Sequence, residues 1–169
     1  MISNIIWANY TELGDKACAI GNHNLGGMMF EAALEVALRS DVEDPRLALS
    51  FDNLTMVYQQ QGQSQRIAPL CKQVLFCCER ARGAGRRSLA STLNNLAELY
   101  FKQGDLARSR ALYRKVLYVF EQIYGSNHAV LVPRLKRLGV ICYKLGRFGE
   151  ALVFYNRAQN ICRAQEDVE

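Results

Sequence analysis

An internal repeat of about 42 residues runs through nearly all of this 169-residue chain and limits the folds that it can adopt. Four glycines keep the repeat, at spacings of 41, 42 and 42 residues: Gly21, Gly62, Gly104 and Gly146. A leucine column (Leu13, Leu54, Leu96, Leu138), a largely aromatic column (Phe30, Cys71, Tyr113, Tyr155) and two columns that begin at Ala17 and Ala33 keep the same register. A repeat of this length indicates an array of similar units that bury their apolar faces against one another.

Each repeat has the pattern of a helix, a turn and a second helix. In the third repeat, Leu93, Leu96 and Tyr100 recur at spacings of three and four residues, which is one apolar face of a helix. Gly104 is suited to end that helix and Asp105 to cap the next one. The whole pattern predicts eight helices, at residues 5–20, 24–39, 47–61, 65–81, 88–103, 106–124, 129–145 and 148–164. The connections at 40–46, 82–87 and 125–128 are polar or glycine-rich.

Two stretches carry a family resemblance. Tyr10-x-x-Leu13-Gly14-x-x-Ala17, and Leu93-Asn94-Asn95-Leu96-Ala97 followed by Tyr100 and Gln103-Gly104-Asp105, resemble a tetratricopeptide repeat. The period of 42 exceeds the usual repeat and is similar to the kinesin-light-chain-like subclass, whose second helix is longer. The resemblance implies an all-α fold, a right-handed superhelix (α-solenoid) of four antiparallel helix pairs. It also implies a single domain over 1–169, with repeats at about 5–40, 47–82, 88–125 and 129–165.

The sequence departs from the family pattern at three places. Thr55 stands where a small glycine or alanine is usual, and Ser109 replaces an alanine at a helix–helix contact. Gly26 and Gly27 fall inside the predicted second helix, and each weakens a helix by about 1 kcal/mol relative to alanine. We therefore expect the N-terminal repeat to be the loosest.

The resemblance implies a protein-binding adaptor or scaffold whose concave groove is lined by the first helix of each pair. Asn53, Asn95 and Arg137 hold matching positions in successive repeats, and an asparagine amide can both donate to and accept from a peptide group. The predicted peptide-binding residues are Asn53, Asn95, Arg137, Lys136, Lys144, Lys102, Phe101 and Tyr143. The cationic groups suit an acidic segment, and the two aromatic residues suit apolar contact. Alternatively, the asparagines join neighbouring helices and the charged residues form solvated faces.

Catalysis and cofactor binding are not expected. The chain has only two histidines, and no nucleophile and base stand at a recognisable spacing. His128 lies in a turn, where we expect it to cap. Gly83-Ala84-Gly85-Arg86-Arg87 has the composition of a phosphate-binding loop but lacks its Gly-Lys-Ser/Thr ending.

The six cysteines form no C-x-x-C pair, so a metal site is not expected. A disulfide framework is not expected either, because the composition can support a full hydrophobic core. Free buried thiols fit better and indicate a reducing, cytoplasmic setting. Met1–Ala8 does not have the pattern of a secretory signal, and no run of eighteen apolar residues predicts a membrane span.

Two other kinds of partner remain open. The net charge of +5 and the basic stretches Arg80–Arg87 and Arg108–Lys115 would suit nucleic acid, which we favour less because no base-stacking or base-reading element accompanies them. A homo-oligomer through the terminal helices is the other alternative. Apolar residues lie near both ends of the chain: Ile2, Ile5, Ile6 and Trp7 near one, and Leu152, Val153, Tyr155 and Ile161 near the other.

Overall fold

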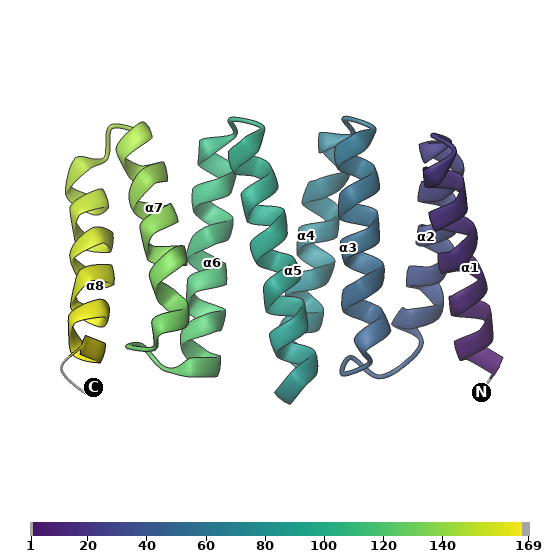
Figure 1. Ribbon diagram of the computed structural model, residues 1–169, viewed down its shortest axis with the longest axis horizontal. Coiled ribbons are helices and arrows are strands. Elements are labelled where there is room, and N and C mark those ends of the chain that lie inside the picture. Colours follow the sequence, from purple (N-terminus) through teal and green to yellow (C-terminus); the bar gives the residue numbers. More distant parts are fainter. Residues whose placement is uncertain (1, 167–169) are drawn as a thin grey trace. The chain divides into compact units, whose positions relative to one another are not determined.

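The structure, a computed structural model, describes residues 2–166 and is helical, without strands, over that range (Figure 1). Its elements are α1 (Ile2–Ala19), α2 (His23–Leu38), α3 (Pro45–Gln60), α4 (Ser64–Arg80), α5 (Gly83–Lys102), α6 (Leu106–Tyr124), the 3-10 helix η1 (Ala129–Leu131), α7 (Val132–Lys144) and α8 (Phe148–Glu166). The predicted all-α class and four helix pairs are confirmed. The chain divides into two compact units, Met1–Leu96 and Ala97–Glu169, with α5 contributing to both.

The glycine column marks the turn inside each helix pair. Gly21, Gly62, Gly104 and Gly146 all have positive φ, between 66° and 78°, which is the left-handed conformation that glycine adopts without steric cost. After Gly104, the side chain of Asp105 accepts a hydrogen bond of 3.0 Å from the Arg108 amide, as an N-cap does. The turn and the cap predicted for the third repeat are therefore both present.

In the first unit, the core is centred on an aromatic ring that lies against a helix backbone. Phe30 of α2 is fully buried, and a Cβ atom added at Gly14 of α1 would lie 2.5 Å from that ring. Only glycine at position 14 lets the ring approach so closely. The indole N–H of Trp7 donates to the hydroxyl of Ser50 at 2.9 Å and so ties α1 to α3.

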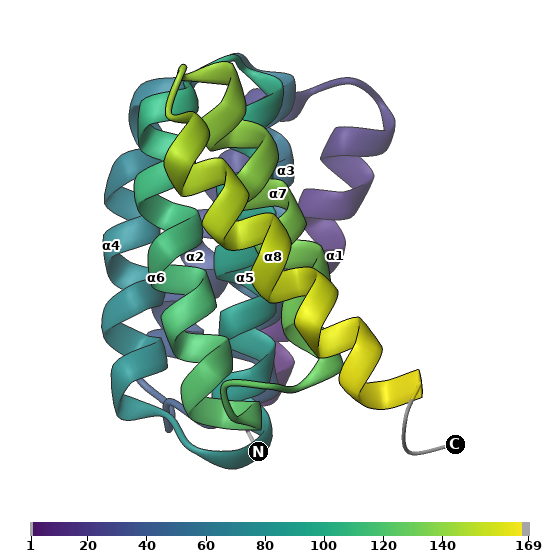
Figure 2. The ribbon, with the colours of Figure 1, turned by 90° about the vertical axis from the view of Figure 1, so that its left-hand side faces the viewer.

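The second unit repeats the same contact at the corresponding positions. A Cβ atom at Gly139 of α7 would lie 2.8 Å from the ring of Tyr155 on α8, and α7 and α8 run antiparallel (Figure 2). The second repeat combines the larger Thr55 with the smaller Cys71 at these two positions. A larger residue on the first helix is thus matched by a smaller one on the second, which keeps the buried volume similar.

The other departures from the family pattern also have local reasons. The hydroxyl of the buried Ser109 donates to the carbonyl of Ala97 at 3.0 Å, so the polar group has a partner. Gly26 and Gly27 are buried, and a Cβ atom at Gly26 would lie 2.4 Å from the sulfur of Cys18. Gly26 therefore permits close packing of α2 on α1. That this repeat is the loosest stays a prediction. The close packing at Gly26 argues against it.

Helix α5 begins at Gly83, five residues earlier than the sequence pattern predicts. A carboxylate oxygen of Glu43 accepts a hydrogen bond of 2.9 Å from the Arg82 amide, which satisfies a donor next to the helix start. Gly85 lies so close to this segment that a Cβ atom there would be 2.7 Å from the Cα of Glu43. The glycine-rich stretch predicted as a connection is thus the first turn of a helix.

Two other helix starts differ in detail from the expected ones. The segment from 129 opens with the 3-10 turn η1, and Nδ1 of His128 accepts a hydrogen bond of 3.2 Å from the Val130 amide. This confirms the capping role expected of His128. In α4, Pro69 lies inside the helix, after its first turn. Among the helices of residues 2–166, none combines the length and the apolar character that crossing a membrane requires.

Candidate functional site

The eight predicted peptide-binding residues are divided between the two units. Asn53 on α3 and Asn95 on α5 belong to the first unit. The other six belong to the second unit, at the end of α5 and on α7: Phe101, Lys102, Lys136, Arg137, Tyr143 and Lys144. The eight residues therefore belong to two separate candidate surfaces.

In the first unit, Asn95 joins two neighbouring helices. Its side-chain amide donates to a carboxylate oxygen of Asp52 on α3 at 3.3 Å. Burial raises the pKa of the Asp52 carboxyl, and hydrogen bonds from Asn95 and Thr92 offset part of that rise. Asn95 thus joins neighbouring helices, which is the alternative to peptide binding that the sequence left open for the asparagines. Asn53 is half-buried and has no hydrogen-bond partner within residues 2–166.

In the second unit, Arg137 is part of a network that links three helices. Its guanidinium donates to one oxygen of Glu98 at 3.0 Å, and the other oxygen accepts from the Tyr113 hydroxyl at 2.7 Å. The Arg137 guanidinium also lies over the Phe101 ring, 4.5 Å from its centroid. Burial and the Glu98 carboxylate raise the pKa of Tyr113 well above its ordinary range. Arg137 and Phe101 thus stabilise the packing of α5, α6 and α7.

Four exposed side chains lie on the same two helices as Phe101 and Arg137. Lys102, Lys136 and Lys144 are exposed, and none has a carboxylate partner within residues 2–166. Lys136 and Tyr143 are seven residues apart on α7, about two turns, and so lie on the same side of the helix. Lys144 has the same relation to Arg137. We call Lys102, Lys136, Tyr143 and Lys144 the lysine surface.

Tyr143 supplies an exposed aromatic group within the lysine surface. Its side chain is 63% exposed, and its ring packs edge-on against Phe148 with the two centroids 5.3 Å apart. Tyr143 and Lys144 hold the repeat positions that Phe101 and Lys102 hold at the end of α5. The lysine surface can therefore offer both positive charge and an apolar contact to a ligand.

The histidine, cysteine and acidic side chains are the remaining groups that could hold a metal ion or react. Among residues 2–166, no group of three histidine, cysteine or acidic side chains has a geometry that could hold a metal ion. Cys77, Cys78 and Cys142 are buried, as the sequence predicts. Burial raises the pKa of the Cys78 thiol to about 11, so it is not a ready nucleophile.

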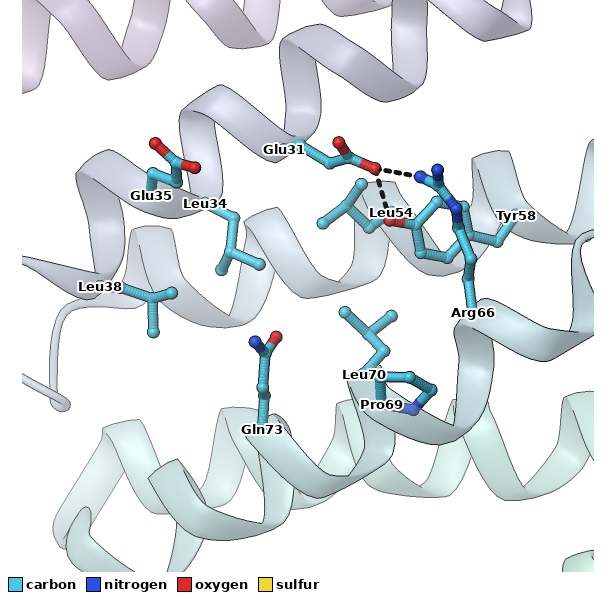
Figure 3. A pocket seen from close by; sticks show the side chains of 10 residues that line it. All are labelled: Glu31, Leu34, Glu35, Leu38, Leu54, Tyr58, Arg66, Pro69, Leu70 and Gln73. Atoms are coloured by element: carbon cyan, nitrogen blue, oxygen red, sulfur yellow. Dashed lines mark hydrogen bonds and ion pairs between the residues drawn. The ribbon is translucent and has the colours of Figure 1, made fainter.

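Sequence reasoning missed a cleft on the other face of the first unit, between the second helices of two repeats. It lies between α2 and α4, has a volume of about 330 Å³, and has α3 as its floor (Figure 3). Its lining residues are Glu31, Leu34, Glu35, Leu38, Leu54, Tyr58, Arg66, Pro69, Leu70 and Gln73. The available signal was a comparison of corresponding positions between repeats, since Leu38 and Gln73 replace charged residues of the later repeats.

Part of the sequence matches a known protein family, and the fold is similar to those of several solved structures. The tetratricopeptide repeat family matches residues 88–164. A search of proteins of curated function gives no match. The crystal structure of BtubC (BKLC) from P. vanneervenii is similar with a TM-score of 0.68 and 22% sequence identity, covering 97% of this chain and 66% of that one.

Two further solved structures are similar. A Podosopora anserina protein described as a kinesin light chain with nearly identical TPR-like repeats has a TM-score of 0.67 and 21% identity, covering 94% of this chain and 76% of that one. MamA has a TM-score of 0.58 and 13% identity, with 95% and 81% covered. At these identities the similarity establishes the fold.

Proposed function

Because residues 88–164 match the tetratricopeptide repeat family and the fold is similar to that of solved kinesin-light-chain TPR-like repeats, we propose that this chain is an adaptor that binds an acidic segment of a partner protein through the lysine surface. Tetratricopeptide repeats generally mediate protein–protein interaction and generally act as scaffolds without enzymatic activity. The proposal assigns the charge of the ligand and the surface that holds it.

The observation that carries the proposal is that three lysines and Tyr143, at the end of α5 and on α7, are all exposed, and that none of these lysines has a carboxylate partner within residues 2–166. Hydrogen bonds between ammonium groups and carboxylates are stronger than neutral ones, and complementary charge raises the rate and specificity of association. The exposed ring of Tyr143 adds the kind of contact that dominates many interfaces. Arg137 and Phe101 are half-buried on the same helices as these exposed residues. We propose that Arg137 can exchange its contact with Glu98 for a ligand carboxylate.

The asparagines of the first unit form a second part of the proposal. The amide of Asn53 can donate to and accept from the backbone of an extended segment. Asn95 gives one N–H to Asp52 and keeps its second N–H and its carbonyl oxygen for a ligand. The buried thiols of Cys77, Cys78 and Cys142 support a reducing compartment, and we propose a cytoplasmic location on that ground.

The test is affinity capture from a nuclease-treated native lysate with two variants of equal net charge. One variant carries Lys102→Glu, Lys136→Glu and Lys144→Glu. The control carries Lys72→Glu, Lys115→Glu and Arg163→Glu, which change exposed positions outside the lysine surface. Proteins lost from the first variant and kept by the control support the proposal. Equal loss from both would mean a general charge effect and would refute it, and a catch removed by nuclease alone would favour nucleic acid.

A second candidate function is self-association through the terminal helices. Phe148, Leu152 and Tyr155 of α8 are exposed by 61%, 60% and 39%, and their spacing of four and three residues forms one stripe. Ile2, Ile5 and Ile6 of α1 are exposed as well, whereas Trp7 is half-buried. Leu152→Glu should then lower the molar mass measured by light scattering in a concentration series. A chain that is monomeric at every concentration would exclude this candidate.

A further inference from the structure

The cleft between α2 and α4 has an apolar interior and a polar rim. Leu34 of α2, Leu54 of α3 and Leu70 of α4 point toward one another across it, and all three are buried (Figure 3). Leu38 also lines the cleft and remains 43% exposed. A volume of about 330 Å³ is at the lower end of the range for ligand pockets, about 300–1,000 Å³. The cleft therefore has room for a large apolar side chain.

A bridge of three side chains bounds the cleft at one end. The Tyr58 hydroxyl donates to a carboxylate oxygen of Glu31 at 2.8 Å, and the Arg66 guanidinium pairs with the same oxygen. These residues come from α3, α2 and α4, so the bridge connects all three helices. Beyond the bridge lies a smaller space of about 170 Å³, which the same three residues line together with Asn24, Gly27, Met28, Gln61 and Gln63. An apolar compartment is thus adjacent to a polar one.

The second unit explains why this cleft is open. There, Nη1 of Arg157 on α8 lies 2.5 Å from a carboxylate oxygen of Glu121 on α6, which joins the second helices of two repeats. At the corresponding positions of the first unit stand Gln73 and Leu38, which cannot form an ion pair. Both of these side chains line the cleft instead. The pair α2 and α4 therefore lacks the ion pair that joins α6 to α8.

The rim of the cleft carries a carboxylate that is available to a ligand. Glu35 is exposed and has no ion-pair partner within residues 2–166. In the polar compartment next to the cleft, the side-chain oxygen of Gln63 is buried and has no donor among the described side chains. Arg66 is already paired with Glu31. A ligand that supplies donors and positive charge is complementary to this rim.

We propose that the α2–α4 cleft binds a short segment of a partner protein that inserts one large apolar side chain and carries a lysine or arginine beside it. The apolar side chain displaces water from the leucine-lined interior, and the cation pairs with Glu35. A segment that lies between two helices in this way uses the groove mode of peptide recognition. This ligand has the charge opposite to that proposed for the lysine surface, so the cleft is a second and independent site.

The experiment uses three short, fluorescently labelled peptides with a common central leucine–phenylalanine pair, flanked by lysine, glutamine or glutamate. Binding to the full chain is measured by fluorescence anisotropy and located by backbone amide shifts in NMR spectra. The lysine peptide should bind at least about tenfold more tightly than the glutamate peptide. Its shifts should fall on α2, α3 and α4. Equal affinity for all three peptides, or lysine-peptide shifts confined to other helices, would overturn the proposal. Binding of the glutamate peptide at α7 reports on the lysine surface alone.

Two sets of variants sharpen the test. Leu38→Glu combined with Gln73→Arg recreates the ion pair found between α6 and α8, and it should abolish binding of the lysine peptide without lowering the melting temperature. Glu35→Lys should reverse the preference toward the glutamate peptide. Glu79→Lys makes the same charge change at an exposed position of α4 outside the cleft and should leave the preference unaltered. Full binding by the Leu38/Gln73 double variant, or the same response to Glu35→Lys and Glu79→Lys, would refute the site. Should the double variant fail to fold, the Glu35 and Glu79 variants decide alone.

Discussion

The guanidinium of Arg137 lies over the ring of Phe101, 4.5 Å from its centroid, so two residues predicted to hold a partner contact each other within the fold. The same guanidinium donates to Glu98. An acidic ligand must compete with that carboxylate for Arg137, whereas the three lysines of the lysine surface have no carboxylate partner within residues 2–166. Alanine at position 137 consequently tests folding as well as binding, and variants of the lysines give the cleaner measure of ligand contact.

Arg137→Ala should lower the free energy of unfolding by about 1–3 kcal/mol, since it removes a half-buried cation–ring contact and a charged hydrogen bond to Glu98. Lys136→Ala, one position earlier and exposed, should change it by less than about 0.5 kcal/mol. Urea unfolding of the full chain measures both values. Equal and small effects would mean that the contacts of Arg137 contribute no stability.

Asp52 should make stability depend on pH in an unusual direction for an aspartate. Burial raises the pKa of Asp52 above its usual value of 3.8, so the folded chain holds this proton more tightly than the unfolded chain. Its contribution to stability is then full below the usual value and falls as pH rises to the raised value. Asp52→Asn keeps an oxygen to accept from Asn95 and removes that loss.

The variant Asp52→Asn should therefore gain stability relative to the wild type at about pH 7 and lose that advantage at about pH 3, below the usual value. Urea unfolding at both pH values gives the comparison. A difference between variant and wild type that stays the same at both pH values would show that the carboxyl of Asp52 titrates alike in the folded and unfolded chain.

The repeat made the fold predictable because its signals are local. Gly104 and Asp105 determine a turn and a cap through their own backbone and side-chain chemistry, and the structure has both. The start of α5 was missed because it depends on Glu43, about forty residues earlier in the chain, whose carboxylate accepts from Arg82. A polar or glycine-rich stretch predicts a connection only when no distant group satisfies its amides.

The candidate site was less predictable for a related reason. Spacing placed Asn95 and Arg137 on corresponding helices, but it could not reveal that each donates a hydrogen bond to a carboxylate, Asp52 for Asn95 and Glu98 for Arg137. The cleft between α2 and α4 lies where a later repeat has a charged side chain. The sequence indicates this only when Gln73 is compared with Arg157, which holds the corresponding position of that later repeat. Side-chain partners across repeats have to be seen in three dimensions.

Thiol reactivity should follow burial in this chain. Cys78 is buried, and its pKa of about 11 leaves almost no thiolate at about pH 8. Cys162 is half-buried. Iodoacetamide added to the folded chain should therefore label Cys162 well before Cys78, as peptide mass spectrometry can quantify. In a urea-unfolded control the two cysteines should react at similar rates. Rapid labelling of Cys78 in the folded chain would contradict the packing of α4.

Two adjacent glycines of α2 should respond oppositely to the same substitution. Gly26→Ala places a methyl group 2.4 Å from the Cys18 sulfur and 3.3 Å from the Gly14 carbonyl oxygen, so it should lower the free energy of unfolding by about 1–3 kcal/mol. Gly27→Ala meets nothing nearer than the Val57 side chain at 3.4 Å, an ordinary contact. It should be neutral or raise stability by up to about 1 kcal/mol, because alanine favours the helix.

A double-mutant cycle identifies the cause of the loss at Gly26. Cys18→Ala removes the sulfur that the new methyl group would strike, so Gly26→Ala should cost less in the Cys18→Ala background than in the wild type. Denaturant unfolding of the four proteins of the cycle, beside Gly27→Ala, provides the measurement. If both glycine variants change stability alike, helix propensity alone governs these positions. The close packing of α1 against α2 at Cys18 would then not be the reason for the glycine.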